Sequence, residues 1–173
     1  MGVLLLLPFF LTRFGLLACR GRKAVRRAAY FAPLQDRGEK AAYWLYQISN
    51  GAILVYLLFL PIRQAPGWLF APGLAVYLAG LALLAASVVD FAAPAENGLN
   101  KNGLYRLSRN PMYVAYFLFF TGCALLTQSP LLFAFVLVFQ VAAHWIVLSE
   151  ERWCIRQFGE AYRQYMKTVR RYL

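Results

Sequence analysis

The sequence is short of the side chains that metal proteins and disulfide-stapled proteins depend on. Only seven of its 173 residues are acidic, one is histidine and three are cysteine. The cysteines are odd in number and widely spaced, and no Cys-x-x-Cys pair occurs, which argues against a disulfide framework and a zinc site. The single His144 cannot anchor a metal cluster alone. We therefore expect no metal site. A glycine-rich dinucleotide fingerprint is also missing.

Charge as a whole is scarce, and apolar residues fill its place. Charged residues make up 14% of the chain and hydrophobic residues 61%, whereas a soluble domain carries about 25% and about 45–50%. This excess is too large for a water-soluble core. The length corresponds to four or five membrane spans of about 20 residues each with their loops. We therefore expect an all-α integral membrane helical bundle.

The basic residues gather in a few places between the apolar stretches. Sixteen of the 18 Lys and Arg fall in 20–40, 101–109 and 152–171. By the positive-inside rule these segments lie in the cytosol. The net charge of +11 then serves orientation and contact with anionic lipid heads, and we expect no nucleic-acid partner.

Five apolar stretches are candidate spans, and they are 2–19, 41–61, 67–89, 112–127 and 131–149. The first stretch differs from the others because it has Arg13 near its middle. An arginine there raises the free energy of membrane insertion by roughly 2.5–3.5 kcal/mol. Either Arg13 snorkels or this helix lies partly in the interface, which leaves five or four crossings. No basic segment precedes the stretch, so we expect a retained helix rather than a cleaved signal peptide.

The remaining segments are of two kinds. Segment 91–111 is rich in Pro, Gly and Asn, which favours an irregular connection. Segment 150–173 mixes charged and aromatic residues at mostly helical spacing. It predicts an amphipathic C-terminal helix that continues the last span, with Gly159 as a kink. We treat 1–173 as one membrane domain, with N-terminal helices in 1–89 and the chemically rich half in 90–173.

The first polar cluster, 103–113, is a turn that leads into a helix. Pro111 suits the first helical turn, and Asn110 or Ser108 can cap the free amides. A helix N-terminus favours an anion, which Arg109 could grip with two hydrogen bonds. The plainer interpretation is that these residues only anchor a helix end. The second cluster begins at Glu150-Glu151-Arg152, and its charges could equally be solvated pairs on a surface helix.

Together the two clusters resemble the isoprenylcysteine carboxyl methyltransferase and phospholipid methyltransferase superfamily. The resemblance covers about 90–171 and is specific because several elements agree in order and separation. These elements are Gly103-Leu104-Tyr105, Arg109-Asn110-Pro111-Met112-Tyr113, Glu150-Glu151, Phe158-Gly159-Glu160-Ala161-Tyr162-Arg163-Gln164-Tyr165 and Val169-Arg170-Arg171.

The resemblance implies a membrane enzyme that transfers a methyl group from S-adenosylmethionine at the cytosolic face. The cofactor would lie between 91–111 and the C-terminal helix, with Glu150 on the ribose hydroxyls and Asn110 with helix amides on the methionine carboxylate. The implied cofactor-binding residues are Tyr105, Asn110, Pro111, Met112, Tyr113 and Glu150, with Asn97 and Asn100 from a stretch of little identity. The candidates beside the reacting atoms are Arg109, Glu150, His144 and Arg171.

Departures from the family pattern bear on the acceptor. Asn110 stands where many relatives have His, which resembles a bacterial-type variant and implies a bacterial inner membrane. Ile146 stands where members that methylate prenylcysteine carry an Arg for the substrate carboxylate, which argues against that acceptor. His144 is either a satisfied core histidine or a base for an amine or thiol. A prenylcysteine carboxylate, a phospholipid amine and a small thiol all stay open as lipophilic or small-molecule acceptors.

Two other functions are weighed against methyl transfer. A membrane reductase of the sterol-reductase type would share a similar C-terminal architecture but bind NADPH. A non-enzymatic membrane or partner-binding protein would lay its C-terminal helix on anionic lipid. In each case the bilayer is the expected partner, and no obligate protein partner is indicated.

Overall fold

The computed structural model describes residues 1–28, 32–65, 67–94 and 98–172. Within them the chain forms helices joined by turns, with η1 a π-helix and η2 a 3-10 helix. The elements in order are α1 (Val3–Phe10), η1 (Leu11–Gly15), α2 (Leu16–Cys19), α3 (Arg22–Ala28), α4 (Arg37–Phe59), α5 (Gly67–Ala92), η2 (Gly103–Arg106), α6 (Pro111–Thr127), α7 (Pro130–Phe158) and α8 (Glu160–Thr168).

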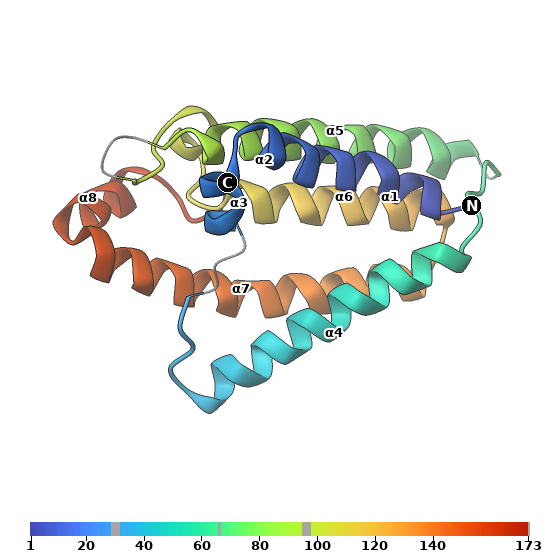
Figure 1. The fold of residues 1–173 in the computed structure, drawn as a ribbon. Coiled ribbons are helices and arrows are strands. Elements are labelled where there is room, and N and C mark those ends of the chain that lie inside the picture. Colours follow the sequence, from blue (N-terminus) through green and yellow to red (C-terminus); the bar gives the residue numbers. More distant parts are fainter. Residues whose placement is uncertain (29–31, 66, 95–97, 173) are drawn as a thin grey trace.

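The expected all-α membrane bundle is confirmed. Three of the described helices, α4, α5 and α7, are long and apolar enough to cross a membrane. Two shorter apolar helices, Val3–Cys19 and Pro111–Thr127, run beside them. Figure 1 shows α5, α6 and the α1–α2 rod in one layer, and α7 with α4 in a second. The pairs α5 with α6 and α4 with α7 make the closest helix contacts.

The helix ends follow local sequence signals. The Asp36 side chain accepts a hydrogen bond from the Glu39 amide at 2.7 Å and begins α4. Ser129 caps α7 through the Leu132 amide at 3.2 Å, directly before Pro130. Gly159, with a φ of +55°, separates α7 from α8, as the sequence predicts for a kink. The predicted C-terminal helix over 150–173 is therefore broken at Gly159 and ends at Thr168, and 169–172 continues outside it.

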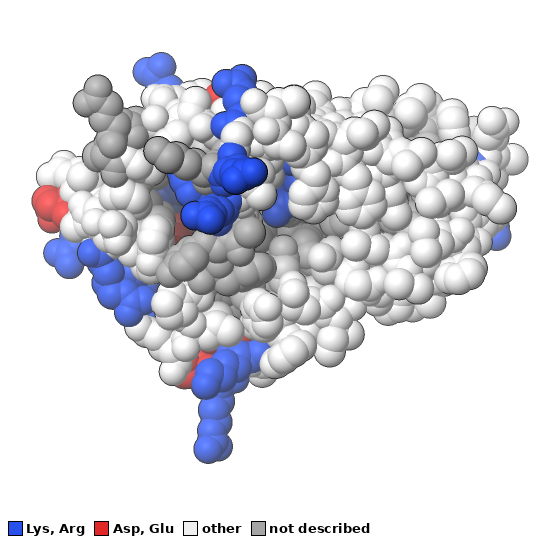
Figure 2. All heavy atoms as spheres, viewed as in Figure 1, with Lys and Arg blue, Asp and Glu red and all other residues white. Residues whose placement is uncertain are grey.

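All three basic segments meet at one end of the bundle. The end of α2, all of α3, the start of α4, the α5–α6 connection and α8 lie there, while Met1 lies at the opposite end (Figure 1). Figure 2 shows Lys and Arg gathered at that end and a mostly uncharged surface along the rest of the visible face. The common side that the charge pattern predicts for these segments is therefore present in the fold.

The core depends on aromatic stacking and on close helix approach. Phe9 of α1 stacks on Phe119 of α6, with ring centroids 4.7 Å apart. In the α5–α6 contact, Gly80 lies against the backbone of Phe119, and a side-chain carbon at that position would overlap it. Small residues let helices in a membrane approach this closely.

Arg13 turns into the bundle rather than out towards the interface. It lies in the π turn η1, in register with the buried residues Phe9 and Leu17. Its guanidinium approaches the sulfur of Met112 at 3.9 Å and lies 5.1 Å from the centre of the Tyr116 ring. The α1–η1–α2 rod thus presents a cation to the interior.

We predict that Gly80→Ala destabilises the protein by about 1–3 kcal/mol, because the added carbon pushes α5 away from α6. The matched control is Gly51→Ala in α4, where the new carbon meets nothing within 4 Å. That change should leave stability equal or raise it by up to about 1 kcal/mol. Thermal denaturation in detergent measures both, and equal melting temperatures for the two variants would contradict the close contact.

Candidate active site

The structure brings the two sequence clusters together at the basic end of the bundle. The Tyr113 hydroxyl, in the first turn of α6, donates to Glu150 Oε1 of α7 at 2.9 Å. Arg109, two residues before α6 in the loop after η2, contacts Glu151 at 3.0 Å. Two segments about 40 residues apart in the chain therefore form one polar site.

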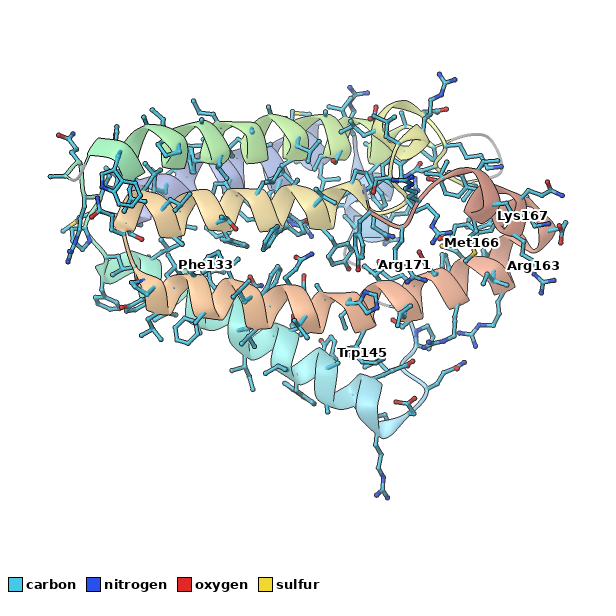
Figure 3. All side chains as sticks on the ribbon, turned by 180° about the vertical axis from the view of Figure 1, so that it is seen from behind. Phe133, Trp145, Arg163, Met166, Lys167 and Arg171 are labelled. Carbon is cyan, nitrogen blue, oxygen red and sulfur yellow. The ribbon has the colours of Figure 1, made fainter. Side chains whose placement is uncertain are left out.

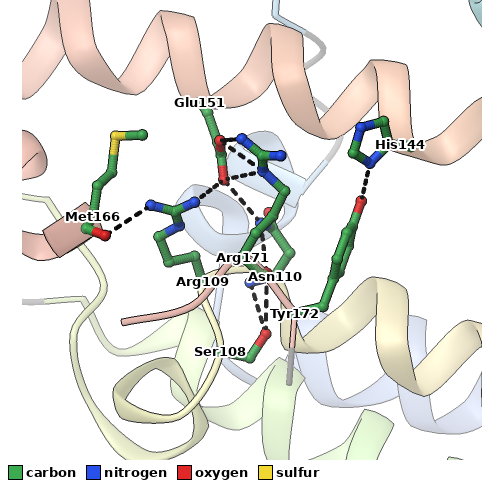
Figure 4. A network of polar contacts seen from close by, with 8 residues as sticks. All are labelled: Ser108, Arg109, Asn110, His144, Glu151, Met166, Arg171 and Tyr172. Atoms are coloured by element: carbon green, nitrogen blue, oxygen red, sulfur yellow. Dashed lines mark hydrogen bonds and ion pairs between the residues drawn. The ribbon is translucent and has the colours of Figure 1, made fainter. Parts of the chain in front are cut away.

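Glu151 is the centre of this site, although the sequence pattern gave prominence to Glu150. Its side chain is buried, and its two oxygens take ion pairs from Arg109 at 3.0 Å and Arg171 at 2.9 Å. The Asn110 amide also donates to Glu151 at 3.4 Å. Figure 4 shows these groups converging from the loop, from α7 and from the C-terminal tail. The hydrogen bonds that Arg171 donates to Glu151 raise the pKa of Arg171, which keeps this guanidinium charged.

The C-terminal tail, residues 169–172, lies alongside the loop before α6. The Arg109 amide donates to the Arg170 carbonyl at 2.9 Å, and Ser108 forms an isolated parallel bridge with Arg170. The Arg171 carbonyl accepts from Ser108 Oγ at 3.3 Å and from the Asn110 amide at 3.1 Å. The tail is thus held by both backbone and side chains.

The sequence predicts Asn110 or Ser108 as the cap of α6. The Asn110 side chain forms no capping hydrogen bond with this helix. Its amide group turns to Glu151 and to the tail instead. Ser108 Oγ accepts from the Asn110 backbone amide at 3.1 Å, so the other option, Ser108, holds the turn just before the helix. Pro111 occupies the first helical position as the sequence predicts.

His144 has a polar partner in the tail. Its Nδ1 lies 3.0 Å from the hydroxyl of Tyr172. Burial raises the pKa of this phenol, with Arg171 acting against the shift, so Tyr172 is protonated at neutral pH. One ring nitrogen of His144 is therefore occupied, and the tail is tied to α7 at two points, Glu151 and His144.

The connection from α5 to α6 is shaped by a carboxylate and a glycine. Asp90 accepts from the Leu104 amide at 2.8 Å and lies against Gly103, which has a φ of +53°. This contact places Tyr105 under α8, where the Tyr165 hydroxyl donates to the Tyr105 carbonyl. Burial raises the pKa of the Tyr105 phenol well above its ordinary value.

Asn100 and Asn97 come from the stretch of little family identity. The buried Asn100 donates to the Phe91 carbonyl at 3.3 Å, while its Oδ1 has no hydrogen-bond partner among the described residues. Asn97 lies outside the described residues.

Some residues of the site carry little signal in the sequence. Glu151 stands beside Glu150, so the Glu-Glu pair does point to it, but not to its role as the shared partner of two arginines. The sequence marks Ser108 only as a candidate cap, and the contacts of Ser108 and Tyr172 with the tail and with His144 are found only in the structure. Arg13 is marked by its rarity in an apolar stretch.

Comparison with known proteins identifies a family domain in part of the chain. Residues 81–161 match the family model described as phospholipid methyltransferase. This segment is a phospholipid methyltransferase domain, and the domain belongs to the isoprenylcysteine carboxyl methyltransferase and phospholipid methyltransferase superfamily. No curated protein matches the chain. Together with the apolar helices, the domain supports a membrane methyltransferase.

The match does not cover the whole site. It includes Arg109, Tyr113 and both carboxylates of α7, but it begins after Arg13 and ends before Arg171. Residues on either side of the matched domain therefore contribute to the polar network.

We predict that Glu151→Gln destabilises the protein by about 3–5 kcal/mol, because the buried Arg109 loses its counter-charge. The tail should also come loose, so trypsin should cut faster after Arg170 and Arg171. Glu160→Gln is the control, since Glu160 is exposed and should change stability by less than about 0.5 kcal/mol. Unchanged melting and unchanged trypsin cleavage in Glu151→Gln would show that the network does not hold the tail.

Proposed function

We propose that this protein is an integral-membrane, S-adenosylmethionine-dependent methyltransferase of a lipophilic acceptor, with its site facing the cytosol. The observation that carries the proposal is the contact between the two motif segments, through Tyr113 with Glu150 and Arg109 with Glu151. The family match over 81–161 supports the transferase class. The same match favours methyl transfer over an NADPH-dependent reductase or a protein without catalytic activity.

The residues at the site fit a nucleoside with a charged amino-acid end. Tyr113 bonds to Oε1 of Glu150, which leaves the other carboxylate oxygen for ribose hydroxyls. Asn100 Oδ1 is buried without a hydrogen-bond partner among the described residues, so it can accept from an amine. In the first turn of α6, the Met112 backbone amide can donate to a carboxylate, since Pro111 has no amide hydrogen and the Tyr113 amide donates to the Asn110 carbonyl.

When bound, S-adenosylmethionine supplies an electrophilic methyl group. The protein's part in an in-line displacement is to place the nucleophile and to keep water away. We propose that Tyr113 and Glu150 contact the cofactor directly. Arg109, Asn110 and Arg171 are engaged with Glu151 and the tail, and we propose that they act as positioning residues that keep the α6 turn and Tyr105 in place.

Two further features support a lipophilic acceptor and a cytosolic site. The site lies at the basic end of a bundle whose face seen in Figure 2 is mostly uncharged along the rest of its length. On the positive-inside rule we propose that this end faces the cytosol, at the inner membrane of a bacterial cell. His144, one and a half turns before Glu150 on α7, stays a candidate for the acceptor side.

We predict that the purified protein binds S-adenosylhomocysteine, and that Glu150→Gln weakens binding by about tenfold or more. Tyr113→Phe should also weaken it, because the carboxylate loses the hydroxyl that orients it. Isothermal titration calorimetry in detergent measures the affinity. Glu160→Gln, at an exposed position outside the site, should bind as the unaltered protein does. No binding by the unaltered protein would overturn the proposed cofactor.

The orientation is tested separately by cysteine labelling. Cys19 is exposed at the basic end, and Cys123 is buried. In intact bacterial cells with Cys154→Ser, we predict that a membrane-impermeant maleimide leaves Cys19 unlabelled until the cells are opened. A matched variant that carries Gln64→Cys at the opposite, exposed turn, with Cys19→Ser, should be labelled without opening. The reverse pattern would place the site outside.

A further inference from the structure

A second feature, outside the network of Glu151, is a cavity that opens between the N-terminal rod and α4. It has a volume of about 150 Å³. Its walls are mostly aromatic and come from α1, η1, α4, α6 and α7. The cavity-lining residues used below are Phe9, Arg13, Tyr46, Asn50, Leu54 and Tyr116. Figure 1 shows α1 and α4 meeting near the N-terminus and diverging towards the basic end.

Arg13 is the one charged residue in the cavity wall. No carboxylate of the described residues comes within ion-pair distance of it, whereas Arg109, Arg152 and Arg171 each have one. Its neighbours are the sulfur of Met112 and the faces of Tyr116 and Phe14, at 5.1 and 5.8 Å from the ring centres. Aromatic faces stabilise a guanidinium without accepting from its fork of hydrogen-bond donors, and the Met112 sulfur that accepts from Arg13 Nη1 is a weak acceptor.

The helix that carries Arg13 is specialised at this point. Arg13 sits in the middle of the five-residue π turn Leu11–Gly15. π turns are rare in proteins, and those that occur are often found at functional sites. A cation inside an apolar segment is costly, and where one is present it usually faces the bundle interior and serves binding or transport. The π turn and the cation within an apolar segment both indicate that Arg13 binds a ligand rather than stabilising the fold.

The guanidinium borders the proposed methyl-transfer site. Met112, which it touches, belongs to the first turn of α6, directly before Tyr113. Tyr46, Tyr113 and Glu150 lie near enough to interact with it electrostatically. The ring centres of Tyr113 and Tyr116 are 6.1 Å apart. The cavity therefore lies on the membrane side of the Tyr113–Glu150 pair.

We infer that Arg13 binds the anionic head of a single-chain lipophile, whose first chain segment lies in the aromatic cavity and whose tail extends between α1 and α4 into the bilayer. In the proposed methyltransferase this ligand is the methyl acceptor, and that role rests on the proposed function. The binding of the ligand to Arg13 does not depend on it.

The cavity itself favours a single chain. Pockets that enclose a drug-sized ligand have about 300–1,000 Å³, so this one can take only the head end of a longer molecule. The walls contributed by Phe9, Tyr46 and Leu54 offer apolar contact, and Asn50 adds a polar group on α4. A two-chain phospholipid would need room for a second chain and a bulky head.

The test uses labelled palmitate and the full-length protein in uncharged detergent micelles, with binding followed by scintillation proximity. Arg13→Met keeps an unbranched side chain but removes the charge, and Arg13→Lys keeps the charge without the fork. Arg20→Met, at an exposed position at the end of the same rod, is the matched control. Hexadecanol and dipalmitoyl phosphatidylglycerol compete at equal mole fraction. S-adenosylhomocysteine binding is titrated in the same preparations.

We expect palmitate to bind, and Arg13→Met to weaken it by about tenfold or more, as for a lost charged hydrogen bond. Arg13→Lys should lie between, and Arg20→Met should match the unaltered protein. Hexadecanol should compete poorly, and its competition should not depend on Arg13. Retained S-adenosylhomocysteine binding in Arg13→Met would show that the variant is folded.

Three results would overturn the inference. They are equal palmitate binding with and without Arg13, hexadecanol competing as well as palmitate, and phosphatidylglycerol competing better than palmitate. The last would replace the single-chain ligand with a phospholipid. If the unaltered protein fails to bind S-adenosylhomocysteine while palmitate binding still depends on Arg13, the anion site stands and the methyltransferase proposal falls.

Discussion

The buried carboxylate of Glu151 is the interaction on which the site depends. Arg109 comes from the α5–α6 connection and Arg171 from the tail, and without an anion between them the two guanidinium groups would repel each other. An ion pair in a low-dielectric interior gains little net stability but fixes its partners' positions, since breaking it leaves a charge unpaired. The same contact closes the tail over the α6 turn and so keeps Tyr113 opposite Glu150. Figure 3, which views the bundle from behind, shows Arg171 directed inward, while Arg163 and Lys167 extend outward from α8.

Much of the fold could be predicted because it follows from local signals. Apolar length, the capping residues Asp36 and Ser129 and the helix break at Gly159 are all readable along the chain. The site was predictable only in part. Neighbouring residues on a helix point about 100° apart, so Glu150 and Glu151 serve different partners, and no pattern says which is which. The side chain of Asn110 and the inward turn of Arg13 depend on distant contacts that spacing along the chain does not encode.

The two parts of the single predicted domain, 1–89 and 90–173, pack against each other through their helices. The closest pairs, α4 with α7 and α5 with α6, each join a helix of the first part to one of the second. The ion pair between Glu39 and Arg152 ties the start of α4 to α7. A domain recognised over 81–161 therefore works in a frame that the surrounding segments provide, and Arg13 and Arg171 reach the site from outside its limits.

The divergence of α1 and α4 has a kinetic consequence. A cavity that opens between two apolar helices exchanges its ligand with the hydrocarbon phase. Its occupancy therefore depends on the mole fraction of the ligand among the surrounding lipids. Diluting the membrane with inert lipid or detergent would empty the cavity even at constant bulk concentration. Turnover at such a site would follow two-dimensional exchange in the leaflet, and its product would leave into the same lipid film from which the ligand came.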